Sequence, residues 1–204
     1  MAKKSNTNVI RQSVLGKAIV NYFRPTYYFK SISKIDLKYL RDVGIKNIIC
    51  DLDNTLVPHY IGIPQRKTIN FINEAKQNNI NFFIASNNTG KRVERFSKNL
   101  SNLDGFYSNI KKPLTMNLTR IMAENDMNIK NTIMIGDQLE MDILAANILH
   151  LNSILVEPLF DESYNYSNLT RFIEKFIYKR LARFNALRKG EYSSLESNID
   201  NKIL

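Results

Sequence analysis

Short apolar runs and amphipathic stretches alternate along most of the chain. The apolar runs have the length of buried strands, and most of them end in polar or acidic residues. They are residues 47–53, 80–86, 106–107, 131–136 and 153–157. The stretches between them carry apolar residues at helical spacing and begin near Pro64, Thr89, Pro113 and Leu139. This alternation predicts an α/β fold, a three-layer Rossmann-like core whose parallel sheet has helices on both faces.

The N-terminal part of the chain has a helical pattern of its own. Residues 9–23 repeat apolar side chains at helical spacing, and this helix is expected to end before Pro25, because proline excludes helical geometry at the preceding residue. The aromatic residues 27–29 are interpreted as a hinge. A short helix is predicted from Asp36 to Val43, since the glycine that follows is a favoured residue just beyond a helix.

A long amphipathic helix is predicted over residues 169–187, with its end at Gly190. Two groups of side chains recur at helical spacing along it. The predicted apolar face consists of Phe172, Ile173, Phe176, Ile177, Phe184 and Leu187. The predicted basic stripe consists of Arg171, Lys175, Lys179 and Arg183.

These patterns divide the chain into four parts. Residues 1–45 are predicted to form a basic helical extension, and residues 46–160 the catalytic core. Residues 161–190 are predicted to form the basic amphipathic helix, and residues 191–204 are expected to be a flexible tail.

Positive charge is concentrated at the two flanks. The chain has 29 Lys and Arg against 19 Asp and Glu, a net charge of +10. Residues 1–46 carry a balance of +8 and residues 170–192 one of +5, whereas residues 47–169 carry −2. Cationic flanks point to an anionic partner, such as a phospholipid membrane or a nucleic acid. The other interpretation, which stays open, is that the apolar faces pack on the core and the charges only solubilise the surface.

Composition excludes several classes of protein. With 44% hydrophobic residues, 7 Gly and 5 Pro, the chain is neither disordered throughout nor collagen-like. A single cysteine, Cys50, excludes an intramolecular disulfide framework and suits the reducing cytosol. No apolar run approaches the roughly 20 residues that span a bilayer, and the N-terminus lacks the apolar region of a secretory signal. A cytoplasmic protein is expected, either dissolved or peripheral at the inner face of the membrane.

The first predicted core strand ends in two carboxylates. Asp51 and Asp53 flank Leu52, and in an extended chain this alternation puts both acidic side chains on one side. Carboxylates that close repel each other, so a cation is needed to keep both ionised. In open parallel sheets, ligands bind beyond the carboxyl ends of the strands, and a cation site is expected there. His59, further along the same loop, could contact a substrate, but a solvated loop residue is the favoured interpretation.

Polar groups near the ends of other predicted strands complete the pattern. Ser86 and Asn87 follow the second strand and offer hydrogen-bond donors to phosphate oxygens, while Lys112 offers a positive charge. Asp137 follows the fourth strand, and Asp142 lies about one turn into the next predicted helix, where it can help to hold a metal. An oxygen-ligated cation such as Mg²⁺, a carboxylate nucleophile and cationic phosphate ligands are what metal-assisted phosphoryl transfer requires.

In this respect the chain resembles the haloacid dehalogenase-like (HAD) phosphatases. Their four motifs are matched in order by Asp51-x-Asp53-x-Thr55, Ser86, Lys112 and Gly136-Asp137 with Asp142. The resemblance implies that Asp51 is the nucleophile, which forms a phosphoaspartate, and that Asp53 is the general acid and base. It also implies that Mg²⁺ is held by Asp51, the Asp53 carbonyl and Asp137, with Asp142 acting through water, and that Ser86 and Lys112 bind phosphate.

The match is closer to one branch, the YqeG family of bacterial HAD phosphatases in subfamily IIIA. The similar segments include Asp-Leu-Asp-Asn-Thr-Leu-Val57, Ser-Asn-Asn88, Lys-Pro113, Gly-Asp-Gln-Leu139 and Ile-Leu-Val156, and the resemblance extends from about residue 16 to 190. Met141 departs from the family pattern, which usually has Thr there, and this removes a hydroxyl near the metal. The family is related to the mitochondrial phosphatidylglycerophosphate phosphatase of yeast, which implies a lipid-phosphate substrate.

The spacing of the motifs leaves no room for a cap domain. Only 32 residues separate Asp53 from Ser86, and 25 separate Ser86 from Lys112. An open site accepts a phosphate on a large molecule, so the predicted function is Mg²⁺-dependent hydrolysis of phosphatidylglycerophosphate to phosphatidylglycerol, a step of phospholipid biosynthesis. Two alternatives stay open: a capless phosphatase for phosphoprotein, nucleotide or sugar-phosphate substrates, and a non-catalytic binder of RNA or ribosomes, although nucleic acid is the less favoured partner.

Overall fold

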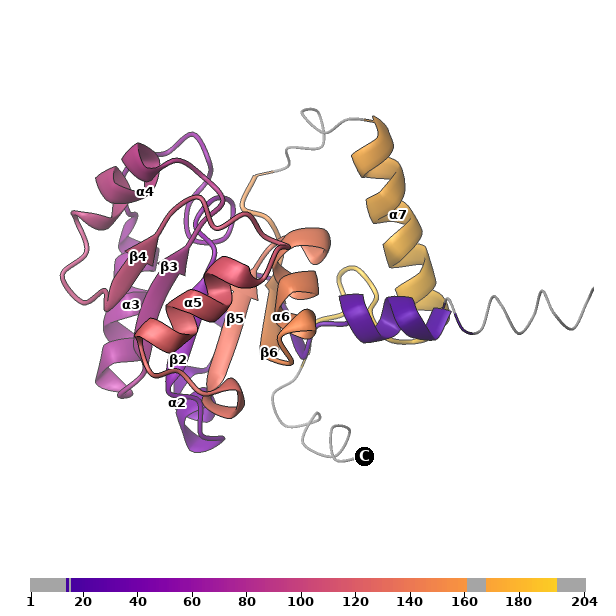
Figure 1. Cartoon of the computed structure of the whole chain (residues 1–204), viewed down its shortest axis with the longest axis horizontal. Helices are drawn as coiled ribbons and strands as arrows, with labels where there is room; N and C mark the ends of the chain where they lie inside the picture. Colours follow the sequence, from indigo (N-terminus) through magenta and orange to yellow (C-terminus); the bar gives the residue numbers. More distant parts are fainter. Residues whose placement is uncertain (1–13, 15, 161–167, 194–204) are drawn as a thin grey trace, which may run out of the picture.

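Six parallel strands form one sheet in the order β1-β6-β5-β2-β3-β4 (Figure 1). The computed structural model describes residues 14, 16–160 and 168–193. The strands are β1 (Tyr27–Phe29), β2 (Asn47–Cys50), β3 (Asn81–Ala85), β4 (Gly105–Tyr107), β5 (Thr132–Gly136) and β6 (Asn152–Val156). The predicted α/β class with a parallel sheet is confirmed.

Helices cover both faces of the sheet. They are α2 (Leu37–Asp42), α3 (Arg66–Gln77), α4 (Gly90–Ser97), α5 (Met116–Glu124), α6 (Leu144–Ile148) and α7 (Asn168–Arg183). Short turns of helix lie at η1 (Ile32–Lys34), η2 (Ile129–Asn131) and η3 (Leu139–Ile143), and residues 16–23 are helical as well. None of the helices among the described residues is long and apolar enough to cross a membrane.

The alternation of side chains along each strand builds two cores. On β2, Ile48 and Cys50 pack with α2, α3 and α4 on one face of the sheet. Ile49 points the other way and packs with α5 and α6. Since every residue of this strand is buried, its sequence is a continuous apolar run rather than an alternating one, as expected for a central parallel strand.

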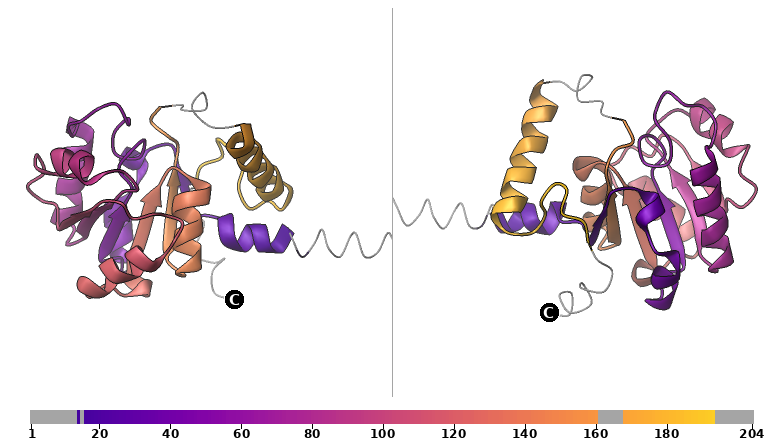
Figure 2. Two further views of the ribbon diagram at one scale, coloured as in Figure 1. Left: turned by 45° about the horizontal axis from the view of Figure 1, so that its top comes forward. Right: turned by 180° about the vertical axis from the view of Figure 1, so that it is seen from behind.

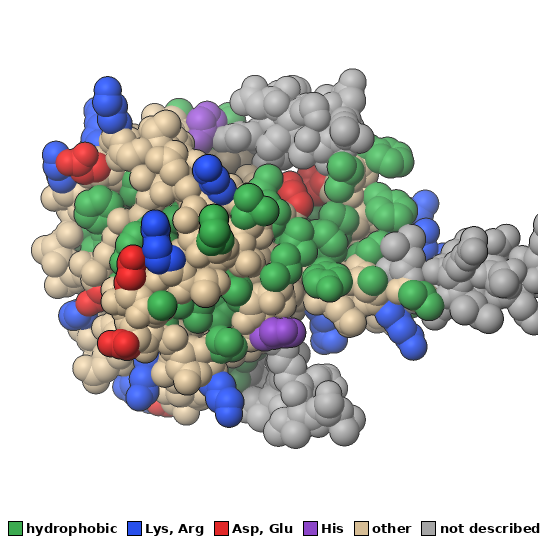
Figure 3. Space-filling model, viewed as in Figure 1, with side chains coloured by type: hydrophobic (Ala, Val, Ile, Leu, Met, Phe, Trp, Pro, Cys, Tyr) green, Lys and Arg blue, Asp and Glu red, His purple; other side chains and the backbone are tan. Residues whose placement is uncertain are grey.

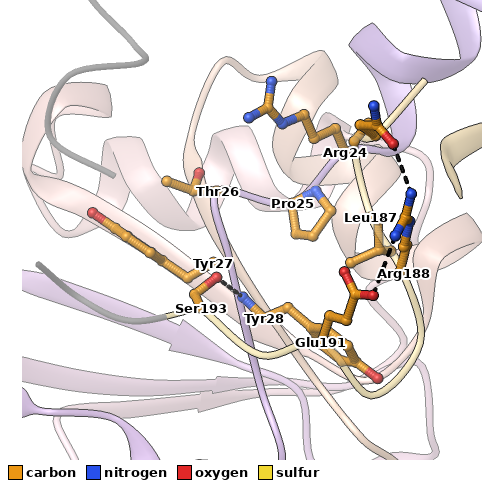
Figure 4. Close-up of a pocket in the computed structure, with 11 residues that line it drawn as sticks. Arg24, Pro25, Thr26, Tyr27, Tyr28, Leu187, Arg188, Glu191 and Ser193 are labelled. Carbon is orange, nitrogen blue, oxygen red and sulfur yellow. Dashed lines mark hydrogen bonds and ion pairs between the residues drawn. The ribbon is translucent and has the colours of Figure 1, made fainter. Parts of the chain in front are cut away.

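The aromatic residues 27–29 form a strand, so their interpretation as a hinge is wrong. Tyr27 pairs with Ile154, and β1 thereby becomes an edge strand next to β6. Its outer side is covered by the chain near Ser193, whose N–H donates to the Tyr28 carbonyl at 2.8 Å and whose Oγ accepts from the Tyr28 N–H at 3.0 Å (Figure 4). A cavity of about 390 Å³ lies between β1 and this segment.

Helix α7 is shorter than predicted, and its buried side is narrower. The helix ends at Arg183, and Gly190, with φ +83°, lies in a later turn rather than at the helix end. Ile177 and Leu181 are buried, together with Leu187 beyond the helix, in a cluster at the β1–β6 side of the sheet. The other members of the predicted apolar face, Phe172, Ile173, Phe176 and Phe184, are exposed, so only part of this face packs against the protein.

The two helical flanks lie together at one end of the sheet (Figures 1 and 2). The helix of residues 16–23 meets the chain just after α7, where a Cβ added to Gly16 would lie 2.2 Å from the Phe184 ring. The predicted helical end before Pro25 agrees with the structure, whereas residues 9–13 and 15 of the predicted helix lie outside the described residues. At α2, the predicted end near Gly44 is confirmed by its φ of +88°.

Candidate active site

The predicted site residues gather in one pocket at the carboxyl ends of the central strands. The pocket measures about 450 Å³, and its lining includes Asp51, Asp53, Ser86, Asn87, Lys112 and Asp142. Asp137, at the end of β5, lies directly beside it. These residues come together because β2, β3 and β5 are neighbouring parallel strands whose carboxyl ends meet at one edge of the sheet.

Three buried carboxylates form the acidic cluster of this pocket. One oxygen from each of Asp51, Asp137 and Asp142 lies within 4.8 Å of the others. Asp51 and Asp137 are each 9% exposed, and Asp142 is 2% exposed. Gly136 leaves the space that Asp142 fills, because a Cβ on this glycine would lie 2.2 Å from the Asp142 Cγ. Packing against Asp142 therefore explains why the fourth motif has a glycine at position 136.

Lys112 is the cation of the cluster. Its Nζ lies 2.5 Å from the Asp51 Oδ1 and 2.7 Å from the Asp142 Oδ1, and it donates to the Ala85 carbonyl at 2.8 Å. The Lys112 backbone is held by the Asn87 side chain, which accepts from its N–H at 2.7 Å and donates to its carbonyl at 2.9 Å. In this structure Asn87 thus positions Lys112, while its expected contact with phosphate stays a prediction.

Burial and like charges shift the acid–base properties of the cluster. Burial raises the pKa of Asp51 to about 7, with Lys112 opposing the shift and the Asp142 charge adding to it. Burial, followed by the charges of Asp142 and Asp51, raises the pKa of Asp137 well above its ordinary value. Burial alone would lower the pKa of Lys112, but the two carboxylates beside it raise that pKa instead. Lys112 therefore stays charged, and the carboxylates have more negative charge than this lysine balances.

Asp53 faces a different set of partners. Its Oδ1 accepts from Arg92 Nε at 3.1 Å and Nη2 at 2.7 Å, and its Oδ2 accepts from the Asn88 amide at 3.0 Å. Arg92 also donates to the Ile61 carbonyl, which ties the loop after the first motif to α4. The carboxylate of Asp53 is not part of the acidic cluster, and its expected metal contact through the backbone carbonyl stays a prediction.

Further hydrogen bonds orient the acidic side chains. Thr55 Oγ1 donates to Asp137 Oδ1 at 3.0 Å, and the Gln138 N–H donates to Asp142 Oδ2 at 3.1 Å. Ser86 is 2% exposed, and its Oγ accepts from the Asn88 N–H at 3.1 Å. These contacts hold the groups of the pocket in place before any ligand binds, as electrostatic stabilisation of a reacting group requires.

Sequence reasoning missed Arg92 and the place of His59. Arg92 lies in the first turn of the helix predicted after Thr89, which places it near the carboxyl ends of the strands. No sequence pattern, however, indicates that it pairs with Asp53. His59 lines the pocket and packs 5.4 Å from the Tyr60 ring and 5.7 Å from the Phe160 ring, measured between centroids. Its interpretation as a merely solvated residue is therefore wrong.

The donor set fits a hard divalent cation. Carboxylate oxygens are the ligands that Mg²⁺ prefers, and three carboxylates with one lysine leave a charge that a divalent cation would neutralise. The same pocket holds a carboxylate at the end of β2, a lysine and a buried hydroxyl, which together suit the binding and transfer of a phosphoryl group.

Comparisons with known proteins agree with this chemistry. The model of haloacid dehalogenase-like hydrolases matches residues 48–110, and the HAD-hydrolase-like model matches residues 109–158. The chain is 31% identical over 162 residues to the probable phosphatase YqeG of Bacillus subtilis, which covers 79% of this chain and 93% of that protein.

Solved structures that are similar to this chain share less sequence with it. An uncharacterized protein from Listeria monocytogenes is 20% identical, with a TM-score of 0.49, over 58% of this chain and 84% of that one. The 3-deoxy-D-manno-octulosonate 8-phosphate phosphatase of Moraxella catarrhalis is 16% identical, with a TM-score of 0.44, over 73% of this chain and 94% of that one.

Proposed function

Because the chain belongs to the YqeG family of HAD phosphatases, we propose that it hydrolyses a phosphomonoester through an aspartyl-phosphate on Asp51, with Mg²⁺ as cofactor. The observation that carries this proposal is the buried cluster of Asp51, Asp137, Asp142 and Lys112 at the carboxyl ends of the central strands. A cluster so dense in charge is costly to bury, and phosphoryl transfer is a reaction that needs it.

The side chains of Asp51, Asp137 and Asp142 would hold the metal. When bound, Mg²⁺ would neutralise part of the negative charge of the carboxylates and of the phosphate, which otherwise repel each other.

In the first step, a carboxylate oxygen of Asp51 forms a bond to phosphorus while the bond from phosphorus to the ester oxygen breaks. The departing oxygen takes a proton from Asp53, which lines the same pocket. In the second step, water attacks the phosphorus of the aspartyl-phosphate, Asp53 takes the proton of the water, and Asp51 is released as a carboxylate. Lys112 and Ser86 stabilise the negative charge of the phosphoryl oxygens.

The openness of the pocket supports a large substrate, and we propose phosphatidylglycerophosphate, which is converted to phosphatidylglycerol. Helix α3 and β3 account for most residues between Asp53 and Ser86, and α4 and β4 for most between Ser86 and Lys112. Within the described core, no cap domain is inserted there. A site without a cap leaves its mouth accessible to a phosphate carried by a lipid. A place in phospholipid biosynthesis, and in subfamily IIIA, belongs to the same proposal.

Hydrolysis of phosphatidylglycerophosphate beside a panel of soluble phosphomonoesters, with Mg²⁺ and with a chelator, tests the proposal. We expect release of phosphate only with Mg²⁺, and a higher kcat/KM for the lipid. The matched control is Asp51→Asn, which keeps the side-chain shape and is expected to lose turnover. If a phosphopeptide, nucleotide or sugar phosphate were turned over faster than the lipid, that class would be the substrate instead. An active Asp51→Asn variant would contradict the assignment of Asp51 as the nucleophile.

A further inference from the structure

The outward side of α7 carries large apolar side chains that the fold does not cover. Phe172 is 68% exposed, Ile173 43% and Phe176 36%. The adjoining side of the helix contacts the protein through Ile177 and Leu181, which are buried. Single exposed apolar residues are common on proteins, but three within five residues of one helix form a patch, and such patches mark interaction sites.

Cations are interleaved with these apolar side chains. Lys175, Lys179 and Arg183 are exposed, and the Arg180 guanidinium lies 5.1 Å from the centre of the Phe176 ring. Between Phe172 and Arg183 the only acidic residue is Glu174, which is partly buried. The outward side of α7 therefore combines a positive field with apolar surface, the combination of a helix that lies in a membrane interface.

The rim of the candidate active site continues this kind of surface. Tyr60 is 63% exposed and Phe160 43%, and their rings lie 5.3 Å apart beside the pocket. The end of α7 that begins at Asn168 lies on the same side of the molecule as the carboxyl ends of the strands (Figure 1). Seven residues, and therefore eight Cα-to-Cα steps, separate Phe160 from Asn168, so the two Cα atoms lie at most about 28 Å apart. Apolar side chains also gather around α7 and on the adjoining side of the core (Figure 3).

We propose that the outward side of α7, together with Tyr60 and Phe160, is a docking surface for an anionic phospholipid bilayer. Phenylalanine and isoleucine would enter the boundary between headgroups and acyl chains, while the lysines and arginines would contact lipid phosphates. Docking in this way turns the mouth of the pocket toward the headgroups. The inference does not depend on the identity of the substrate.

A bilayer fits this surface better than the other occupants do. Two copies of the chain that met through this side would bring their cations together, and these repel. A nucleic acid would satisfy the cations but would leave Ile173 without an apolar environment. Only a lipid surface meets both the charge and the exposed apolar area of the same helix face.

Co-sedimentation with vesicles tests the proposal on the full chain. The probes are vesicles of phosphatidylcholine alone and vesicles of phosphatidylcholine and phosphatidylglycerol in equal amounts, each at low and high salt. We expect binding to the vesicles that contain phosphatidylglycerol, and weaker binding as salt rises, because salt screens the attraction between the cations and the lipids.

Two double variants separate the apolar and the cationic contributions. Each cation near an anionic surface contributes about fivefold in partitioning, so Lys175→Glu with Lys179→Glu should weaken binding at least about 25-fold. Phe172→Ser with Phe176→Ser should weaken it by about tenfold for each ring that enters the lipid. Both side chains of each pair are exposed, so both variants are expected to fold and to hydrolyse a soluble phosphomonoester as the unchanged chain does.

The matched control is Lys46→Glu with Lys130→Glu, which makes the same change of charge at exposed positions beside the amino ends of β2 and β5. This control should bind vesicles much better than the variant of α7. Failure of the unchanged chain to sediment with phosphatidylglycerol vesicles at low salt would overturn the proposal. The proposal would also be overturned if the α7 variants bound vesicles as well as the control does. The same holds if the chain did not bind vesicles but associated with itself or bound RNA, and the α7 variants abolished that association.

Discussion

Replacing Asp137 by Asn should stabilise the protein when no divalent cation is bound. The variant keeps an oxygen that can accept the hydrogen bond from Thr55, and it removes one negative charge from the cluster of three carboxylates. Because burial and the neighbouring carboxylates raise the pKa of Asp137, its charged form is disfavoured in the folded, metal-free protein.

The size of the effect follows from the distances in the cluster. Two unit charges 4.8 Å apart repel by about 3.5 kcal/mol at an effective dielectric constant of about 20. Asp137 has two carboxylate neighbours, and the attraction of Lys112, together with the hydrogen bond from Thr55, offsets only part of their repulsion. Since proton uptake relieves part of the remainder, we expect Asp137→Asn to raise the free energy of unfolding by about 1–3 kcal/mol above neutral pH.

The sign of the pH dependence is part of the prediction. A carboxyl group whose pKa is raised in the folded state does not destabilise the fold below its unfolded pKa of about 4. As the pH rises from there toward the folded pKa, it destabilises the fold increasingly. The advantage of Asp137→Asn should therefore be small near pH 4 and should grow as the pH increases. The pKa of Asp51, raised to about 7, adds to the same trend in the unchanged chain.

Thermal unfolding in a chelator across this pH range measures the effect. A gain of about 1–3 kcal/mol corresponds to a rise in Tm of roughly 3–10 °C for a chain of this size. Asp126→Asn, at an exposed position, makes the same change of charge and should alter stability by less than about 0.5 kcal/mol. Added Mg²⁺ should stabilise the unchanged chain more than Asp137→Asn. A variant no more stable than the unchanged chain in the chelator would refute the reasoning.

Three further changes probe other contacts of the pocket. Gly136→Ala puts a Cβ 2.2 Å from the Asp142 Cγ, so denaturant titration should show a loss of about 1–3 kcal/mol, and an unchanged midpoint would contradict the packing argument. Lys112→Met leaves the carboxylates without their cation and should lower the free energy of unfolding by about 3–5 kcal/mol near neutral pH, and by less in acid. An equal loss of stability at both pH values would contradict the role of Lys112 in balancing their charge. Arg92→Lys keeps the charge but not the two N–H donors to Asp53, so steady-state kinetics should show kcat falling about tenfold with Tm little changed, whereas a fall in Tm alone would indicate a structural role.

Most of the candidate site was predictable because its residues stand next to recognisable strand ends. Asp51, Ser86 and Asp137 each follow a short apolar run, and parallel strands bring such positions to one edge of the sheet. The pairing of Asp53 with Arg92 was not predictable in this way, because it joins side chains 39 residues apart and no spacing rule relates them. Similarly, the contacts that Lys112 and Asn87 make depend on the path of the loop before α5.

The fold could be predicted where local patterns decide it, and not where distant contacts do. The helices and strands from β2 to β6 follow from apolar periodicity and from turn residues such as Gly44. The three residues of β1 are too few to signal a strand, and only their distant partner makes them one. Along α7, apolar side chains point in several directions, so the pattern does not tell that Ile177 is buried while Phe172 is exposed.

The pairing of β1 with β6 has a consequence for synthesis on the ribosome. Residues 27–29 leave the exit tunnel long before residues 152–156, to which they are hydrogen-bonded in the finished sheet. At about 5–20 residues per second, the ribosome needs roughly 6–25 s to make the intervening chain. During that interval β2 and β3 can pair with each other, while the earliest strand has no neighbour. The edge strand β1, although it is made first, is therefore among the last parts of the sheet to be completed.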